Sequence, residues 1–302
     1  MLDISVIILT YNEEIHIRRC IENVLPVVKE IFIIDSFSTD ATLDIAREYP
    51  NVHILQNKWE NNYAKQFNWG LEHAPITTKW VLRLDADEYL TNELKAELCN
   101  KLPALSSIYT GVIFPLRRVF LGKPIRHGGM GNIKLLRLFQ YGKARSEVRS
   151  MDEHIQLSEG EAIEFKNEFA DDNLNNLSWW TQKHIGYAIR EAVDLLDIEL
   201  NLTGVAINDK NKEISSQARS KRMKKHQYAR MPLFWRAFMY FFLRYIVKGG
   251  FLEGKEGFLW HFLQGWWYRT LVDAKIFEIK KACGDDREKI KEYVKTNYNI
   301  AL

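Results

Sequence analysis

The fold is decided at the start of the chain by the run ISVIIL, residues Ile4–Leu9, which is apolar except for Ser5 and rich in β-branched side chains. A short, nearly continuous apolar run is typical of a strand that is covered on both faces of its sheet. A helical pattern follows over Glu13–Leu25, and a second strand-like run covers Glu30–Asp35. The opening residues therefore predict a strand, a helix and a strand, which is the repeat of a parallel sheet.

The same alternation continues through the first hundred residues. The further predicted elements are a helix from Ser38 or Thr39 through Tyr49, a strand over Val52–Leu55, a helix over Asn62–His73 and a strand over Lys79–Leu84. Strict alternation predicts parallel strands with helices on both faces of the sheet. The carboxyl ends of such strands lie at one edge, and that edge is where ligands bind.

Polar and acidic residues gather at these strand ends. They form three segments: Thr10–Glu13, Asp35–Asp40 and Asp85–Asp87. Asp85 and Asp87 follow the fourth strand, so both carboxylates could hold a divalent cation whose other positions bind a diphosphate. An ordinary acidic turn is the alternative, and the Ser38 region could simply cap a helix. Asp35 is harder to explain in this way, because a buried carboxylate without a partner is costly.

No glycine-rich loop follows the first strand, in either the G-x-G-x-x-G or the G-x-x-x-x-G-K-S/T form. This absence argues against a dinucleotide-binding dehydrogenase and a P-loop phosphotransferase. A phosphate site made of carboxylates needs a metal to neutralise the charge, and Asp85 and Asp87 suit that need.

Composition indicates a folded protein of a reducing compartment. The 302 residues are 46% hydrophobic and 27% charged, which is ordinary for globular chains. Cys20, Cys99 and Cys283 lie far apart, so neither a zinc cluster nor a disulfide framework is expected. The first residues lack a basic segment followed by an apolar core, so we expect no secretory signal and a cytoplasmic protein.

Three ordered motifs resemble a known family. They are VIILTYNEE at Val6–Glu14, IIDSFSTDAT at Ile33–Thr42 and LDADE at Leu84–Glu88. Together they resemble a family 2 glycosyltransferase of the GT-A fold, most similar to bacterial enzymes of lipopolysaccharide core, O-antigen or exopolysaccharide synthesis. The resemblance implies an α/β fold with a mixed sheet flanked by helices, in a catalytic domain over residues 1–165. Residues 1–100 would be its nucleotide-sugar half and residues 101–165 its acceptor half.

The resemblance also implies a role for each motif residue. Thr10, Tyr11 and Glu13 would line the pocket for the base and ribose of a nucleotide sugar, and Asp35 would hydrogen-bond the base or ribose. Gln66 stands where the family often has an arginine or a polar group beside the nucleotide, so its role is open. Asp85 would contact the ribose or the metal. Asp87 would bind Mg²⁺ or Mn²⁺ between the two phosphates.

An inverting transfer needs a base for the acceptor hydroxyl. In the family this is an acidic residue some sixty positions after the metal motif, and the segment SMDEH at Ser150–His154 falls there. The resemblance favours Glu153 as the base, with Asp152 second, because the pair departs from both common spellings of the motif. Burial beside the acceptor would raise the proton affinity of such a carboxylate. A solvated acidic turn is the alternative.

The C-terminal region, residues 166–302, is predicted to be helical. Its Ser215–Gly250 stretch has no Asp or Glu and carries nine Lys or Arg residues among many aromatics. Arg236, Arg244 and Lys248 fall near one side of a helix, so they could face anionic headgroups while the apolar face enters the membrane interface. The alternatives are helices that pack on the catalytic domain and a nucleic-acid surface, which no recognised motif supports.

The sequence thus predicts a metal-dependent, inverting glycosyltransferase at the cytoplasmic face of the inner membrane. It would move a sugar from a nucleotide diphosphate donor, a UDP-sugar by resemblance, to a lipid-linked or lipopolysaccharide acceptor. A nucleotidyltransferase on a similar sheet is the second enzyme interpretation, although it usually has a glycine-rich, basic first loop. A membrane-bound scaffold with a degenerate site is the non-catalytic one.

Overall fold

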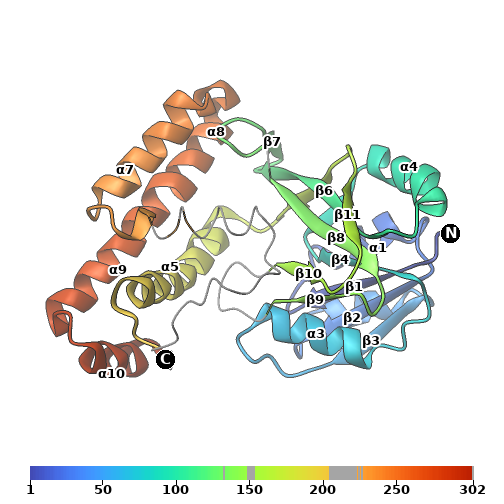
Figure 1. Ribbon diagram of the computed structural model, residues 1–302, viewed down its shortest axis with the longest axis horizontal. Coiled ribbons are helices and arrows are strands. Elements are labelled where there is room, and N and C mark those ends of the chain that lie inside the picture. The colour runs from blue at the N-terminus through green and yellow to red at the C-terminus, as the bar shows by residue number, and fades with distance from the viewer. Residues whose placement is uncertain (132, 148–153, 204–222, 224, 226, 301–302) are drawn as a thin grey trace. The chain divides into compact units, whose positions relative to one another are not determined.

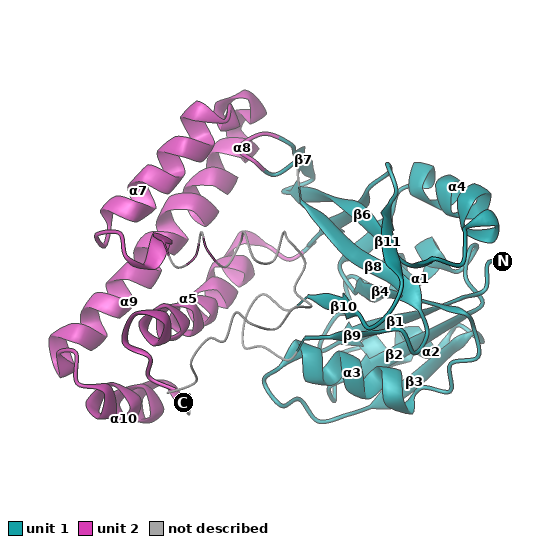
Figure 2. Cartoon of the chain, viewed as in Figure 1, with its two compact units in different colours: residues 1–126, 130–174 teal, residues 127–129, 175–302 magenta. Residues whose placement is uncertain are grey.

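Figure 1 shows the computed structural model, which describes every residue except 132, 148–153, 204–222, 224, 226 and 301–302. The chain forms two compact units (Figure 2). Unit 1 contains residues 1–126 and 130–174, and unit 2 contains residues 127–129 and 175–302.

Unit 1 is built on a mixed sheet. The first four strands are parallel neighbours in the order β3-β2-β1-β4, with bounds β1 Ile4–Thr10, β2 Glu30–Asp35, β3 Val52–Gln56 and β4 Trp80–Asp85. The sheet continues through β8, β6, β12 and β5, with bounds β5 Glu88–Leu90, β6 Tyr109–Phe120, β8 Lys134–Gln140 and β12 Phe169–Asp172. β8 runs antiparallel to both β4 and β6. The predicted mixed sheet is confirmed, and because β12 pairs with β5 and β6, unit 1 extends beyond residue 165.

Shorter strands and the helices complete unit 1. β7 Lys123–Ile125 and β11 Glu161–Glu164 pair with β6, and β9 Ala144–Ser146 pairs with β10 Ile155–Leu157. The helices are α1 Ile17–Val24, α2 Thr42–Arg47, α3 Tyr63–His73, α4 Asn92–Lys101 and the short η1 Leu102–Ala104.

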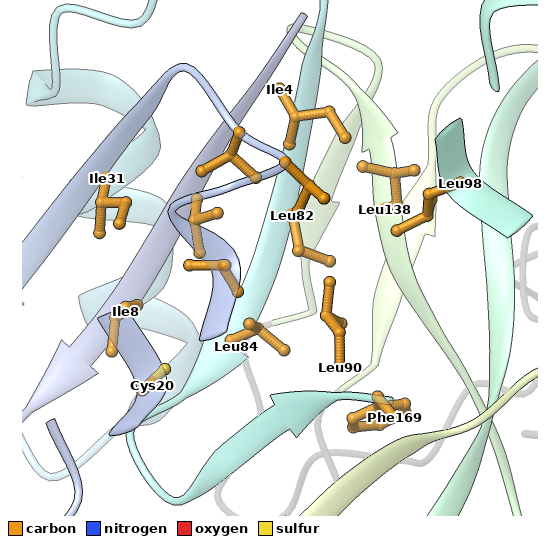
Figure 3. Packing of buried hydrophobic residues seen from close by; sticks show 14 of the residues in the cluster. Ile4, Ile8, Cys20, Ile31, Leu82, Leu84, Leu90, Leu98, Leu138 and Phe169 are labelled. Carbon is orange, nitrogen blue, oxygen red and sulfur yellow. The ribbon is translucent and has the colours of Figure 1, made fainter. Parts of the chain in front are cut away.

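The first strand supplies both faces of the core, which explains its uninterrupted apolar sequence. Ile4 and Ile8 point into a cluster with side chains of α1 and α4 (Figure 3). Ile7 points the other way, into a cluster with Phe67 of α3 and Phe139 of β8. Because helices cover both faces, every side chain of this strand except Leu9 is buried.

The predicted elements of the first hundred residues are all present, with changes at the helix starts. The first helix begins at Ile17 rather than near Glu13. Neither Ser38 nor Thr39 caps α2, which begins at Thr42. Asn62 does cap α3, because its side-chain oxygen accepts a hydrogen bond from Lys65 N.

Unit 2 is helical. Its elements are α5 Leu177–Leu200, α7 Trp235–Phe242, η2 Leu243–Val247, η3 Gly250–Glu253, α8 Gly254–Trp260, η4 His261–Trp267, α9 Tyr268–Cys283 and α10 Arg287–Tyr298. Apolar side chains of α5, α9 and α10 form its core. No helix in the described part of the chain has both the length and the apolar character to cross a bilayer.

The predicted orientation of two unit 2 arginines is wrong. Arg236 is 2% exposed and Arg244 is 5% exposed, so neither faces solvent. The guanidinium of Arg236 pairs with buried Asp273 at 2.6 Å, and Arg244 Nε donates to the carbonyl of Gly128 at 3.1 Å. These internal partners turn both cations inward, whereas Lys248 is exposed as predicted.

Candidate functional site

Two neighbouring strands bring Thr10 and Asp35 together at the carboxyl edge of the sheet. The two residues lie opposite each other in the β1–β2 pairing, and the Thr10 hydroxyl donates to Asp35 Oδ1 at 2.9 Å. Asp35 is fully buried and also accepts from the backbone and hydroxyl of Ser38 and from the Gln56 amide. Its partners compensate the burial, and its carboxylate orders the loop that follows β2.

The loops after β1 and β2 bind each other through short polar side chains. Asn12 N donates to Ser38 Oγ, and Asn12 Oδ1 accepts from Thr39 N. Glu14 adds two similar bonds, because its N donates to Asp40 Oδ2 and its Oε2 accepts from Ala41 N. This pairing fixes the loop backbone and leaves outward-facing side chains free to meet a ligand.

Tyr11 and Phe37 are the outward-facing aromatics of these loops. Tyr11 is 59% exposed and Phe37 is 53% exposed, and Phe37 has a positive φ of 62°. Exposed aromatic rings at the ligand-binding edge of an α/β sheet are suited to stacking on a flat heterocycle.

Glu13 is held by a buried histidine. His16 is 0% exposed, and its Nδ1 lies 2.6 Å from Glu13 Oε2. Its Nε2 accepts a hydrogen bond from Leu174 N, so the proton is assigned to Nδ1, which donates to Glu13. The carboxylate predicted to meet the ribose is therefore oriented by a neutral imidazole.

The turn after β4 presents the two predicted metal ligands. Asp85 lies opposite Leu9 in the β1–β4 pairing, and its side chain is 41% exposed. The Asp87 carboxylate accepts from Asn173 Nδ2 at 2.9 Å, and its backbone carbonyl accepts from Arg19 and from Asp172 N. Both ends of the turn are thereby fixed by β4 and by the segment around β12.

A buried ion pair lies under this turn. Glu88 and Arg137 are 2% and 7% exposed, and their carboxylate and guanidinium are 2.5 Å apart. Glu88 Oε2 also accepts from Asp85 N at 2.9 Å, while Arg137 Nη2 lies 3.7 Å from Asp85 Oδ2. Burial raises the pKa of Glu88 well above its usual range, and the charge of Arg137 opposes that rise.

Asp171 of β12 adds another carboxylate near the turn. Burial raises the pKa of Asp171 to about 6, the charges of Asp87 and Asp85 contribute to the rise, and its ion pair with Arg118 opposes it. Carboxylates this close together repel one another, so a bound cation would be favoured near them.

The donor set of the turn fits a divalent cation that is shared with a substrate. Among the residues that the structure describes, no three carboxylate, histidine or cysteine side chains converge as a complete metal cage. Mg²⁺ is usually held by one or two carboxylates together with phosphate oxygens and water. Asp85 and Asp87 are two such hard oxygen donors, and the exposed side of Asp85 leaves room for the phosphates.

Gln66 is buried and bonded to its neighbours. It is 2% exposed, its Oε1 accepts from Asn57 Nδ2, and its Nε2 donates to Ser36 Oγ and to the Asn57 carbonyl. It lines a cavity of about 650 Å³ together with Asn57, Glu60, Lys65, Asn68, Trp69, Glu72, Arg145 and Ser146. Gln66 therefore connects this polar cavity to the loop after β2.

The two predicted bases lie outside the described residues. Asp152 and Glu153 belong to the range 148–153, and the description resumes at His154, whose carbonyl accepts from Glu147 N. Their roles remain predictions.

The sequence interpretation missed several residues of this edge. They are His16, Arg19, Arg118, Arg137, Asp171 and Asn173. One signal could have indicated Arg137, because it is a charged residue inside the largely apolar strand KLLRLFQ. A charged residue in such a position needs a buried partner.

The fold and this edge define an α/β domain suited to a nucleotide ligand, and the family comparison gives its class. Residues 5–149 match the family described as "Glycosyl transferase family 2". Residues 5–149 thus carry the match to the family 2 glycosyltransferases that the three motifs predicted.

Curated relatives match over part of their length. The chain is 36% identical over 92 residues to the SPbeta prophage-derived glycosyltransferase SunS of Bacillus subtilis, which is 30% of this chain and 21% of that protein. It is 31% identical over 151 residues to the lipopolysaccharide core biosynthesis glycosyltransferase LpsC of Rhizobium meliloti, which is 49% of this chain and 54% of that protein. The chain thus spans about a fifth and about half of these two relatives.

Solved structures match the chain at lower sequence identity. The mannosyltransferase PcManGT from Pyrobaculum calidifontis, in complex with GDP-Man and Mn²⁺, is 16% identical with a TM-score of 0.49, over 91% of this chain and 87% of that one. S. aureus TarS 1-349 is 14% identical with a TM-score of 0.43, over 99% and 93% of the two chains.

Proposed function

We propose that the protein is an inverting glycosyltransferase that takes its sugar from a nucleotide diphosphate donor. One observation supports this function above the others. Asp85 of β4 lies opposite Leu9 of β1, and Thr10, which follows Leu9, lies opposite Asp35 of β2. Three adjacent strands therefore bring the predicted metal and nucleotide residues to one edge. A nucleoside and its diphosphate would meet chemically different groups along this edge.

Each residue has a part in this proposal. Thr10, Tyr11, Glu13 and Asp35 would form the base and ribose pocket, with Asp35 also maintaining the loop through its bonds to Ser38. Gln66 would shape the wall of the neighbouring cavity.

Asp85 and Asp87 would hold Mg²⁺ or Mn²⁺ with the diphosphate. The metal supplies Lewis-acid stabilisation of the departing nucleoside diphosphate. Glu88 and Arg137 would hold the backbone of this turn, because Glu88 accepts from Asp85 N.

The acceptor hydroxyl would lose its proton to Glu153, or to Asp152 as the second candidate. A single displacement at the anomeric carbon then forms the new glycosidic bond and inverts the configuration. The similarity to LpsC supports a lipopolysaccharide or lipid-linked acceptor, and a UDP-sugar is the donor that we propose to test first.

The test is donor turnover by the full chain. We expect release of the nucleoside diphosphate from one member of a panel of nucleotide sugars in the presence of Mn²⁺, and loss of that release with a chelator. Asp87→Asn should abolish it, whereas the matched change at exposed Asp44, which pairs with Arg47 of its own helix, should not. Equal turnover by both variants would overturn the metal assignment.

A further inference from the structure

An apolar stripe lies on the outer side of α7 and η2, outside the proposed active site. Its members recur at spacings of three and one residues, and each is more than a third exposed. The apolar stripe consists of Trp235, Phe238, Met239, Phe242, Leu243, Ile246 and Val247. Exposed fractions reach 66% at Trp235 and 64% at Val247, whereas soluble proteins normally bury such a helical face.

The opposite side of the same helix is firmly packed, so the stripe cannot turn inward. Arg236 binds Asp273 of α9 through two nitrogens and donates to the carbonyls of Tyr228 and Ala229. Ala237 is fully buried beside it. Rotating the helix to bury the stripe would break these bonds and expose the Arg236–Asp273 pair.

Adjacent segments enlarge the apolar surface. Phe251 and Leu252 of η3 are 50% and 62% exposed, and η3 packs against η2. The ring of Phe258 in α8 contacts that of Tyr245 at 5.7 Å between centroids. Figure 1 shows α7 and α8 in the same helical region, and η3 contacts both η2 and α8.

The charge around this surface indicates what covers it. No Asp or Glu occurs between residues 215 and 252, Lys248 directly follows the stripe and is exposed, and Arg230 and Lys255 are exposed in the flanking segments, the latter beside half-buried Glu256. In a symmetric contact with a second copy, these cations would lie opposite the same cations of the partner, and no negative charge would balance them. An anionic bilayer offers both the apolar interior and the negative headgroups.

We propose that the apolar stripe docks unit 2 on a bilayer that contains anionic lipid. The stripe enters the interface, and Lys248 and Lys255 meet the headgroups. Binding depends mainly on the apolar side chains, because Arg236 and Arg244 are committed to internal partners. The proposal deepens the proposed function by naming how a lipid-linked acceptor would be reached, yet it depends only on unit 2.

Vesicle flotation of the full chain tests the proposal. The vesicles contain phosphatidylcholine alone or phosphatidylcholine with phosphatidylglycerol. We expect the wild type to float with the anionic vesicles and less with the neutral ones. The triple variant Trp235→Gln, Met239→Gln, Val247→Gln should bind at least about 100-fold more weakly, because three large apolar groups no longer leave water.

A matched control places the same change at exposed apolar residues elsewhere. Ile108, Leu121 and Ile185 are 50%, 51% and 43% exposed, and their triple glutamine variant should float like the wild type. If the Trp235 triple variant fails to fold by circular dichroism, the single variants Trp235→Gln and Val247→Gln take its place.

The outcomes separate the possible occupants. Equal flotation of the stripe variant and the wild type would overturn the proposal. So would a wild type that does not float but forms a dimer in light scattering that the stripe variant loses. Flotation is scored without any donor, so a failed glycosyl transfer assay leaves this result standing, and a failed flotation leaves the transfer assay standing.

Discussion

The carboxylate of Glu88 lies 2.5 Å from the guanidinium of Arg137 and also accepts a hydrogen bond from the backbone nitrogen of Asp85. Both side chains are buried beneath the acidic turn. The pair thus links β8 to the start of the turn that carries the proposed metal ligands, and it makes the position of Asp85 depend on a residue that is distant in sequence.

Arg137→Met should destabilise the protein by about 3–5 kcal/mol, because it leaves a buried carboxylate without its cation. Proton uptake by Glu88 would reduce this loss, since its pKa is already raised by burial. Urea unfolding measures the change. Arg145→Met is the control, since Arg145 and its partner Glu72 are both exposed, and we expect a change of about 1 kcal/mol or less. Similar losses in the two variants would contradict the structural role of the buried pair.

The Arg236–Asp273 pair in unit 2 gives a second test of burial. Arg236→Met should cost about 3–5 kcal/mol, because Asp273 would remain uncompensated in the core. The corresponding change at Arg18, whose ion pair with Glu48 is exposed, should cost about 1 kcal/mol or less. Chemical unfolding of the two variants decides the point. A small loss for Arg236→Met would indicate that this arginine faces solvent, as the sequence pattern first suggested.

His261 makes the stability of unit 2 sensitive to acid. Burial, reinforced by the charge of Arg244 and opposed by Glu253, lowers the pKa of His261 to about 4. In the unfolded chain the His261 ring is protonated below its ordinary pKa of about 6.5, whereas in the folded protein it stays neutral down to about pH 4. Above about pH 6.5 the ring is neutral in both states and does not change the stability. Between about pH 6.5 and 4 the unfolded state alone gains the proton, so stability falls as the pH falls. The full loss would be about 3 kcal/mol.

His261→Leu tests this prediction, because neither ring nitrogen has a hydrogen-bond partner among the described residues. Unfolding free energies at pH 7.5 and 4.5 should differ less in the variant than in the wild type. Parallel changes in both proteins would show that other groups cause the acid sensitivity.

The base assignment can be tested without structural information on its segment. Glu153→Gln should lower glycosyl transfer by about 10²–10⁴-fold, because the acceptor hydroxyl would keep its proton. Nucleotide binding by calorimetry should not change. Glu159→Gln, at an exposed residue that pairs with Lys143, is the control. If Asp152→Asn abolishes transfer and Glu153→Gln does not, the second candidate is the base.

The sequence predicted the first half of unit 1 well because local signals determine it. The strand runs at Ile4–Leu9 and Glu30–Asp35 are mostly apolar, and the Thr10–Asp35 contact follows from the parallel pairing of β1 with β2. The starts of the first two helices were less predictable, because Ser38 bonds to Asp35 instead of capping a helix.

The support of the acidic turn could not be predicted in the same way. Glu88 and Arg137 come from strands that are not neighbours in the sheet, and no periodic pattern connects them. The inward position of Arg236 in α7 was likewise hidden. A helix with arginine on one side is expected to expose it, whereas the distant Asp273 and the carbonyls of Tyr228 and Ala229 hold Arg236 inside.

Binding of a nucleoside diphosphate with and without metal tests the central claim most directly. Isothermal titration of UDP into the full chain should show strong binding with Mn²⁺ and at least about 100-fold weaker binding with a chelator, which corresponds to about 3 kcal/mol. Asp87→Asn should bind as weakly with Mn²⁺ as the wild type does without it, and Asp44→Asn should match the wild type. Metal-dependent binding of equal strength in Asp87→Asn would contradict the assignment of the Asp85–Asp87 turn as the site that joins metal and diphosphate.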